Sequence, residues 1–238
     1  MEKILLIVPA FNEEKSLPLL MKDINNVKEK FPIQLDTLII NDFSTDNTKN
    51  FLSNSEDINF INLPCNLGIG GAVQTGYKFA AEYGYDYAVQ IDGDGQHNPI
   101  YLENLYKEIK KGNNFVIGSR FLEKKGFQSS FTRRIGINFF KILIKILTKE
   151  TITDATSGFR IADREIIELF AKSYPSDYPE PDTLVTLLKK GYKVKETPVI
   201  MHERTHGESS IKIFNSIHYM IKVTLAIVLN NTLNERKI

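Results

Sequence analysis

Short apolar runs alternate with segments of helical spacing along the first half of the chain. Apolar runs of strand length lie at Ile4–Val8, Leu35–Ile40, Ile58–Leu63, Tyr85–Ile91 and Phe115–Gly118. Between them, helical spacing lies at Glu14–Lys30, Gly70–Tyr83 and Pro99–Lys111. Strands that alternate with helices favour a mostly parallel sheet with helices on both faces. The pattern therefore predicts an α/β fold.

The second half is less regular but also contains clear elements. Helices are predicted at Phe131–Thr148, Arg164–Lys172, Asp182–Lys190 and Ile211–Leu229, a short strand or turn at Ser157–Ile161, and an alternating strand at Tyr192–Val199. No repeat, low-complexity linker or Pro/Gly-rich hinge separates these elements. We therefore expect one domain over residues 1–210, followed by a C-terminal amphipathic helix in residues 211–238.

Polar clusters follow the first, second and fourth predicted strands. They lie at Val8–Glu14, Asn41–Thr48 and Gln90–His97. Ligands bind beyond the carboxyl ends of the strands in such sheets. Asp42 stands at a strand end, where a carboxylate can accept hydrogen bonds from a base or a ribose. A structural interpretation stays open, because Ser44 or Asp46 would also cap a helix, and Asn12 or Glu13 would begin one.

The strongest local signal is Asp92-Gly93-Asp94, where two carboxylates follow an apolar strand with one glycine between them. Carboxylates this close repel each other unless a cation lies between them. Oxygen ligands favour Mg²⁺ or Mn²⁺, and Mg²⁺ often combines a few carboxylates with substrate phosphates. The alternative is a solvated Asp-Gly turn.

The order of the motifs carries more information than any one of them. The chain contains, in sequence, Pro9-Ala10-Phe11-Asn12-Glu13-Glu14, Asp42-Phe43-Ser44-Thr45-Asp46-Asn47-Thr48, Asn66-Leu67-Gly68, Asp92-Gly93-Asp94-Gly95-Gln96-His97, Gly118-Ser119-Arg120 and Ser157-Gly158-Phe159-Arg160. This arrangement closely resembles glycosyltransferase family 2, which has the GT-A fold. It is most similar to the polyprenyl-phosphate sugar transferases related to dolichol-phosphate mannose synthase. The resemblance runs from Lys3 to about Lys212.

The resemblance implies roles for individual residues. The nucleotide-sugar donor, a UDP- or GDP-sugar, would be bound by Pro9, Phe11, Glu13, Asp42, Gly68, Asp92, Arg204 and Lys212. The metal, Mg²⁺ or Mn²⁺, would be held by Asp92, Asp94 and Gln96. The acceptor would be bound by Arg120, Arg133, Arg134 and Ser157, with the catalytic set formed by Asp92, Asp94, Arg120 and Arg134. Departures from the family pattern are Asn41 for a frequent aspartate, Phe43 for a usual glycine, and His206 and Ser210 in the C-terminal loop.

The acceptor decides which groups the chemistry needs. A polyprenyl phosphate is already anionic near neutral pH and needs cations rather than a base. Arg120, Arg133 and Arg134 would supply these cations, since arginine matches phosphate oxygens. The alternative is a glycan hydroxyl, whose proton would go to Glu180 or Asp182 as general base. These two residues would equally favour the beginning of a helix, and Asp154 is expected to be structural.

Charge and composition narrow the choice of partners. The net charge is +1, so no global field recruits nucleic acid. Residues 120–149 are locally basic, however, with eight cations and one acidic residue. A basic amphipathic helix at Phe131–Thr148 would lie on an anionic bilayer or pack on the core. The helix Ile211–Leu229 would contact a membrane, a small membrane-protein partner, a second copy of the chain or its own domain.

Two further features bear on location. The single cysteine, Cys65, excludes an intrachain disulfide and agrees with a reducing cytoplasm. No apolar stretch reaches the ~18 residues of a transmembrane helix. We therefore expect a cytoplasmic protein that associates peripherally with the inner face of the cell membrane.

Other functions fit the motifs less well. A sugar-1-phosphate nucleotidyltransferase would need a glycine-rich basic loop after the first strand, where this chain has Pro9 to Glu14. A nucleotide-sugar-binding subunit that needs a membrane partner stays open. We favour the interpretation that the chain is a metal-dependent enzyme of cell-envelope glycan synthesis. The family resemblance implies that it inverts the configuration of the sugar. It would move a hexosyl or N-acetylhexosaminyl group to a polyprenyl phosphate.

Overall fold

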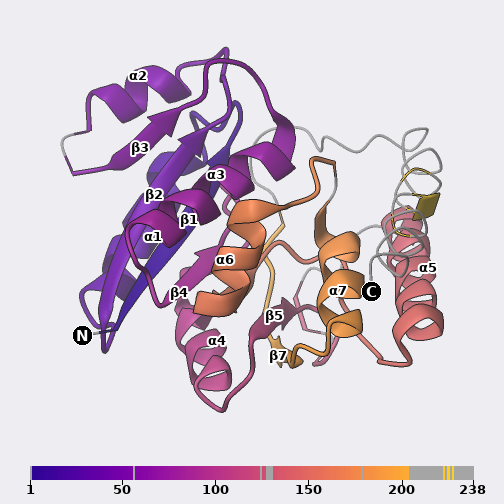
Figure 1. The fold of residues 1–238 in the computed structure, drawn as a ribbon. Helices are drawn as coiled ribbons and strands as arrows, with labels where there is room; N and C mark the ends of the chain where they lie inside the picture. The colour runs from indigo at the N-terminus through magenta and orange to yellow at the C-terminus, as the bar shows by residue number, and fades with distance from the viewer. Residues whose placement is uncertain are drawn as a thin grey trace.

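The computed structural model describes residues 2–55, 57–123, 125–126, 131–177 and 179–203, together with 222, 224, 225 and 227; of residues 131–133 it describes the backbone alone. Within these residues a seven-stranded sheet has the order β3-β2-β1-β4-β6-β5-β7 (Figure 1). The strands are β1 (Lys3–Ala10), β2 (Gln34–Asn41), β3 (Asn59–Asn62), β4 (Tyr87–Gln90), β5 (Phe115–Ser119), β6 (Arg160–Asp163) and β7 (Val194–Pro198). All strand pairs are parallel except those of β6, which runs antiparallel to both β4 and β5.

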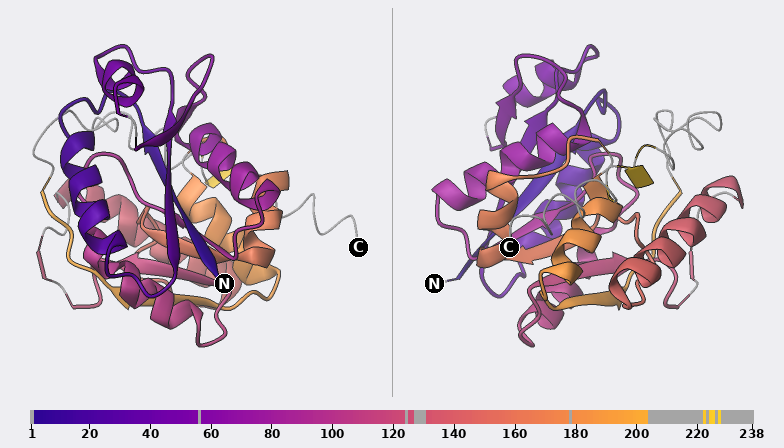
Figure 2. Two further views of the ribbon diagram at one scale, coloured as in Figure 1. Left: turned by 90° about the vertical axis from the view of Figure 1, so that its left-hand side faces the viewer. Right: turned by 45° about the vertical axis from the view of Figure 1, so that its right-hand side comes forward.

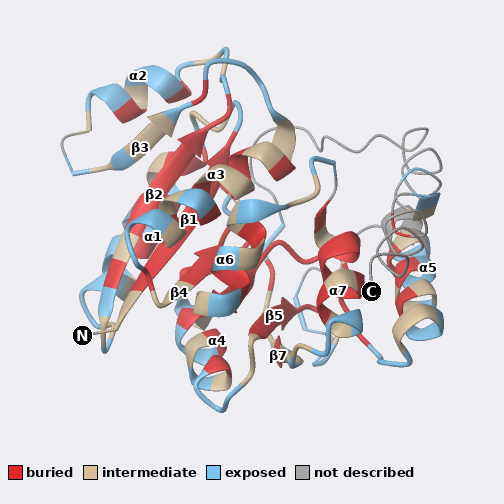
Figure 3. Cartoon of the chain, viewed as in Figure 1, coloured by how far each residue is buried: buried red, intermediate tan, exposed pale blue. Residues whose placement is uncertain are grey.

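Helices cover both faces of this sheet (Figure 2). They are α1 (Leu17–Lys28), α2 (Thr48–Ser53), α3 (Gly68–Glu82), η1 (Pro99–Tyr101), α4 (Leu102–Ile109), α5 (Phe131–Thr148), α6 (Arg164–Lys172) and α7 (Pro179–Lys189). Successive side chains of a strand point to opposite faces, so β1 contributes Leu5 and Ile7 to one core and Leu6 and Val8 to the other. Figure 3 shows the inner strands of the sheet largely buried, the edge strands β3 and β7 partly exposed, and the outward sides of the helices exposed.

Most predicted elements are confirmed, and the differences have local causes. α5 and α6 have the predicted bounds, whereas α7 begins three residues earlier, at Pro179. Of the predicted strand or turn at Ser157–Ile161, the last two residues belong to the antiparallel β6 and the first three form the loop that leads into it. The short helix α2 was not predicted as an element. Asn47 is the N-cap of this helix and its side chain makes no capping hydrogen bond, whereas Asp46 Oδ1 accepts the Thr48 backbone N–H at 2.9 Å in the turn that precedes it.

The C-terminal predictions are not tested. Most of the predicted helix Ile211–Leu229 and the domain division after residue 210 lie outside the described residues. Among the residues that are described, no helix is both long and apolar enough to cross a bilayer.

Candidate active site

The loops after β1, β2 and β4 meet at one edge of the sheet, as the sequence predicts. The strand register places Ala10 beside Asn41, and the Asp42 backbone donates to Ala10 O at 2.9 Å. Beyond β4, the Gly93 backbone donates to Pro9 O at 3.2 Å. The residues that follow these strands therefore form a single surface.

The first two of these loops are joined by hydrogen bonds from one to the other. Asn12 Oδ1 accepts the Thr45 backbone N–H at 2.8 Å, and the Asn12 N–H donates to Ser44 Oγ at 3.0 Å. The Glu13 N–H donates to Thr48 Oγ1 at 2.9 Å. The predicted nucleotide-binding segments are thus fixed to each other by direct hydrogen bonds.

Asp42 connects this surface to the loop after β3. Its side chain is buried, and Oδ1 accepts the Leu67 backbone N–H at 2.7 Å. Burial raises the pKa of Asp42, although hydrogen bonds from the Leu67 and Gly68 backbones oppose that rise. Gly68 begins α3 with a φ of 74°, which glycine adopts without strain.

Asp92 is held from three sides but keeps 32% of its side chain exposed. Oδ1 accepts Gln90 Nε2 at 3.1 Å, and His97 Nε2 lies 3.8 Å from Oδ2. A Cβ atom on Gly158 would lie 2.5 Å from Oδ2, so only glycine leaves room for this carboxylate. Burial raises the pKa of Asp92, with His97 lowering it and Asp94 raising it. The partly exposed carboxylate is open to a ligand.

Asp94 and Gln96 lie on the same loop, and Asp94 lines a cavity of about 360 Å³. Asp94 is buried, and its Oδ1 accepts the Gln96 backbone N–H at 3.0 Å. Gln96 Nε2 donates to His202 O at 3.3 Å. The cavity is lined by Ser16, Leu19, Leu20, Asp23, Asp94, Gly95, His202 and Glu203.

These groups fit a divalent cation that also binds a diphosphate. Among the described residues, no three His, Cys, Asp or Glu side chains converge on one metal position. Two carboxylates with substrate phosphates completing the shell are a usual arrangement for Mg²⁺. The charge of Asp94 raises the pKa of Asp92. This repulsion between the two carboxylates is what a bound cation would remove.

Arg120, predicted to contact the acceptor, is only 5% exposed and already has an anionic partner. Its Nε and Nη2 donate to the two oxygens of Asp154 at 2.7 and 2.5 Å. This ion pair agrees with the expectation that Asp154 is structural. Glu196 on β7 in turn accepts the backbone N–H groups of Thr153 and Asp154, each at 2.8 Å. The acceptor role of Arg120 stays a prediction.

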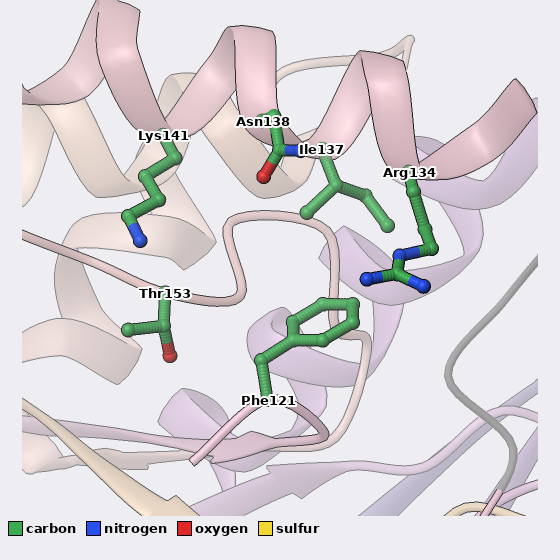
Figure 4. A pocket seen from close by; sticks show the side chains of 6 residues that line it. All are labelled: Phe121, Arg134, Ile137, Asn138, Lys141 and Thr153. Carbon is green, nitrogen blue, oxygen red and sulfur yellow. The ribbon is translucent and has the colours of Figure 1, made fainter. Parts of the chain in front are cut away.

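A cavity of about 230 Å³ lies beneath α5 (Figure 4). It is lined by Phe121, Arg134, Ile137, Asn138, Lys141 and Thr153. In Figure 4 the side chains of Arg134 and Lys141 extend from the helix toward the loops opposite, one near each end of the cavity. Sequence reasoning assigned Arg134 to the acceptor and counted Lys141 only among the cations of a basic helix, although their seven-residue spacing places both on one face of that helix. The Arg133 side chain lies outside the described part of the chain.

A second buried arginine, Arg160, holds the Ser157 turn against α7. Its Nε donates to Ser157 O at 2.5 Å, and Nη1 donates to Glu180 O at 3.2 Å and to Thr183 Oγ1 at 3.0 Å. Burial raises the pKa of Glu180, while the charge of Arg160 opposes that rise. Asp182, the other candidate base, is 5% exposed. Arg160 stood in a quoted motif, but the sequence did not assign it this role.

The family model that matches residues 5–170 is that of glycosyl transferase family 2. The chain belongs to glycosyltransferase family 2. It is 30% identical over 202 residues to the uncharacterized protein MJ1222 of Methanocaldococcus jannaschii (83% of this chain, 81% of that one). It is 30% identical over 217 residues to an undecaprenyl-phosphate mannosyltransferase of Micrococcus luteus (88% and 87%). Glucosyl-3-phosphoglycerate synthase of Mycobacterium tuberculosis, solved with Mn²⁺, UDP and phosphoglyceric acid, superposes with a TM-score of 0.71 at 18% identity, over 96% of this chain and 78% of that one.

These matches confirm the predicted family resemblance, the GT-A fold and the assignment as a glycosyltransferase. The roles of individual residues stay predictions. Of the donor-binding set, Arg204 and Lys212 lie outside the described residues.

Proposed function

We propose that this glycosyltransferase moves a sugar from a UDP- or GDP-sugar to a polyprenyl phosphate, with inversion at the anomeric carbon. The observation that carries the proposal is the cavity beneath α5, where Arg134 and Lys141 offer two cations for an anionic acceptor. The M. luteus relative named for transfer to undecaprenyl phosphate supports the same acceptor class. A role in cell-envelope glycan synthesis follows from that class.

The donor would bind along the edge formed by the loops after β1, β2 and β4. Pro9, Phe11, Glu13, Asp42 and Gly68 would line the nucleotide pocket. The buried carboxylate of Asp42 would accept hydrogen bonds from the base or ribose. The hydrogen bonds between the first two loops would hold both loops in position around the donor.

Asp92 and Asp94, with Gln96, would hold Mg²⁺ or Mn²⁺ against the diphosphate. When bound, such a cation neutralises the charge that develops on the departing nucleotide. The chain's part is to fix the carboxylate positions. Gln90 donates to Asp92, and Gly158 leaves the space that Asp92 occupies.

The acceptor phosphate is ionised at neutral pH and needs no base. Arg134 and Lys141 would bind its oxygens, with Ser157 nearby and Arg120 contributing through its paired, buried charge. An acceptor oxygen would attack the anomeric carbon from the side opposite the diphosphate, and the configuration would invert.

The outer face of α5 is suited to an anionic bilayer. Its exposed apolar side chains are Ile135, Phe139, Ile142 and Ile146, of which Ile146 is 72% exposed. Their spacing of four, three and four residues forms one stripe along the helix. With cationic residues on the same helix, the stripe supports peripheral association with the inner face of the membrane, where a polyprenyl phosphate would lie. Residues 211–238 would add a contact to the membrane, a small membrane protein or a second copy.

The test is a screen of nucleotide sugars with Mn²⁺ or Mg²⁺, a short polyprenyl phosphate and the purified chain. We expect radiolabel to enter the organic phase with wild type and with the control Asp57→Ala, an exposed aspartate before β3, but not with Asp94→Ala. If the donor is bound or hydrolysed but no lipid product forms, a polyprenyl phosphate is excluded as the acceptor.

One observation favours a second acceptor class within the same enzyme family. The raised pKa of Glu180 brings this carboxylate closer to the range of a general base for a glycan hydroxyl. If one of these residues is the base, its own variant, Glu180→Gln or Asp182→Asn, would abolish transfer to a hydroxyl acceptor. Turnover close to wild type in both variants would exclude a base role for either residue.

A further inference from the structure

Large apolar side chains are exposed along the edge that the donor would occupy. Phe11 is 48% exposed, Phe43 is 52% exposed and Leu67 is 46% exposed. They follow the ends of β1, β2 and β3, which are neighbours in the sheet. Single exposed apolar residues are ordinary on protein surfaces. Three of them beside the same ligand-binding edge point to a ligand that covers them.

Phe43 has an unusual backbone in addition to its exposure. Its φ is 61°, in the left-handed region that bulky residues rarely adopt. Hydrogen bonds on both sides impose this conformation. The Asp42 N–H donates to Ala10 O at 2.9 Å, and the Ser44 N–H donates to Asn41 Oδ1 at 3.2 Å. Glycine would adopt the same conformation without strain. The fold therefore holds a strained aromatic residue whose ring contributes little to the core.

Phe43 directly follows Asp42, the buried carboxylate of the predicted nucleotide pocket. An aromatic face beside a hydrogen-bond acceptor provides the two contacts that proteins use for a nucleobase, which are stacking on the ring and bonding at the edge. We propose that Phe43 stacks on the nucleobase of the donor and is a donor-binding residue. This inference rests on the proposed function. Because every base has a stacking face, Phe43 contributes affinity for the nucleotide rather than a choice between UDP and GDP.

The test measures nucleotide affinity by calorimetry in the presence of Mn²⁺, with UDP, GDP and pyrophosphate as separate probes. Both Phe43→Gly and Phe43→Ala remove the stacking side chain. Each is expected to lower the affinity for the nucleotide that wild type binds by about tenfold. Pyrophosphate, which has no base, should bind these variants as it binds wild type. Phe43→Tyr should retain nucleotide affinity.

Two controls separate stacking from changes in the fold. Phe43→Gly relieves the backbone strain, so its melting temperature should equal or exceed that of Phe43→Ala. Tyr83 is also an exposed aromatic residue, at 56%, but its carbonyl accepts Lys3 Nζ at the opposite edge of the sheet. Tyr83→Ala should leave nucleotide affinity unchanged.

The possible outcomes are distinct. Unchanged nucleotide affinity in Phe43→Gly and Phe43→Ala would overturn the inference. An equal loss for nucleotide and pyrophosphate would also overturn it, since Phe43 would then act on the shape of the loop. A wild-type chain that binds pyrophosphate but neither UDP nor GDP would contradict the proposed function, and the inference with it.

Discussion

The donor edge and the region beneath α5 hold their polar groups in different ways. At the donor edge, backbone N–H groups and a glycine position the side chains, as at Asp42, Asp92 and Asn12. Beneath α5, the cations are on long side chains at a helix surface. The buried Arg120, which precedes the cavity residue Phe121 in the chain, is paired with Asp154. A donor site built from short side chains and backbone leaves its groups few rotamers to lose. A site built from Arg134 and Lys141 can adapt to its ligand at the cost of side-chain entropy.

The largest effect is expected at the buried ion pair between Arg120 and Asp154, which we expect to stabilise the region next to the cavity beneath α5. Asp154→Ala leaves the Arg120 charge buried without its partner, and we expect a loss of about 3–5 kcal/mol in the free energy of unfolding. Urea denaturation measures this loss. The double variant Arg120→Met, Asp154→Leu removes both charges and should recover much of it. An Asp154→Ala chain as stable as wild type would show that the ion pair does not anchor this region.

The next effect separates activity from stability at the donor edge. Asp92→Asn should lower turnover by about 10²–10³-fold, because it removes charge from the group proposed to hold the metal. Burial raises the pKa of Asp92, so ionisation opposes folding, and the neutral variant should melt at or above the wild-type temperature at pH 8. Turnover is measured with the donor found in the screen. A joint loss of activity and stability would contradict this account.

A smaller effect is expected for the two cations that line the cavity beneath α5. Arg134→Ala and Lys141→Ala should each raise the KM for the acceptor about tenfold through loss of a charged hydrogen bond, while kcat changes little. Their free energy of unfolding should stay within about 0.5 kcal/mol of wild type, as for other surface substitutions. Lys107→Ala, an exposed lysine on α4, is the control. A fall in kcat without a change in KM would assign these cations to the transition state instead.

The smallest effect is a pH dependence of stability at Glu180. Since burial raises its pKa in the folded chain, the stability that Glu180 contributes is present in acid and is lost as the pH rises through the folded-state pKa. Glu180→Gln should therefore match wild type near pH 4 and exceed it at pH 8 in urea denaturation. Glu103→Gln, on the exposed side of α4, should show no such divergence. If Glu180→Gln were instead most stable relative to wild type in acid, folding would lower the pKa of Glu180, which contradicts a pKa raised by burial.

Much of the fold and of the donor edge could be predicted because each depends on local pattern. Alternating apolar runs gave the strands, and parallel strands bring their carboxyl ends together, so Asp42 and Asp92 were expected at one edge. The direction of β6 could not be inferred from four residues, and α2 is too short to show a helical period. The pairing of Arg120 with Asp154 and the cavity between Phe121 and α5 depend on tertiary packing between distant segments, which periodicity does not encode.

The reversed direction of β6 has a consequence for engineering the specificity of this enzyme. In the parallel strands the variable loops of the site come after each strand, but β6 enters the sheet at that edge, with Arg160 beside Gln90. The segment before β6 therefore reaches the site, and the segment after it, at Asp163 and α6, lies at the other edge. Insertions or loop exchanges at residues 149–156 should therefore change which acceptor the enzyme uses. The same changes after β6 would lie at the opposite edge of the sheet, away from the site.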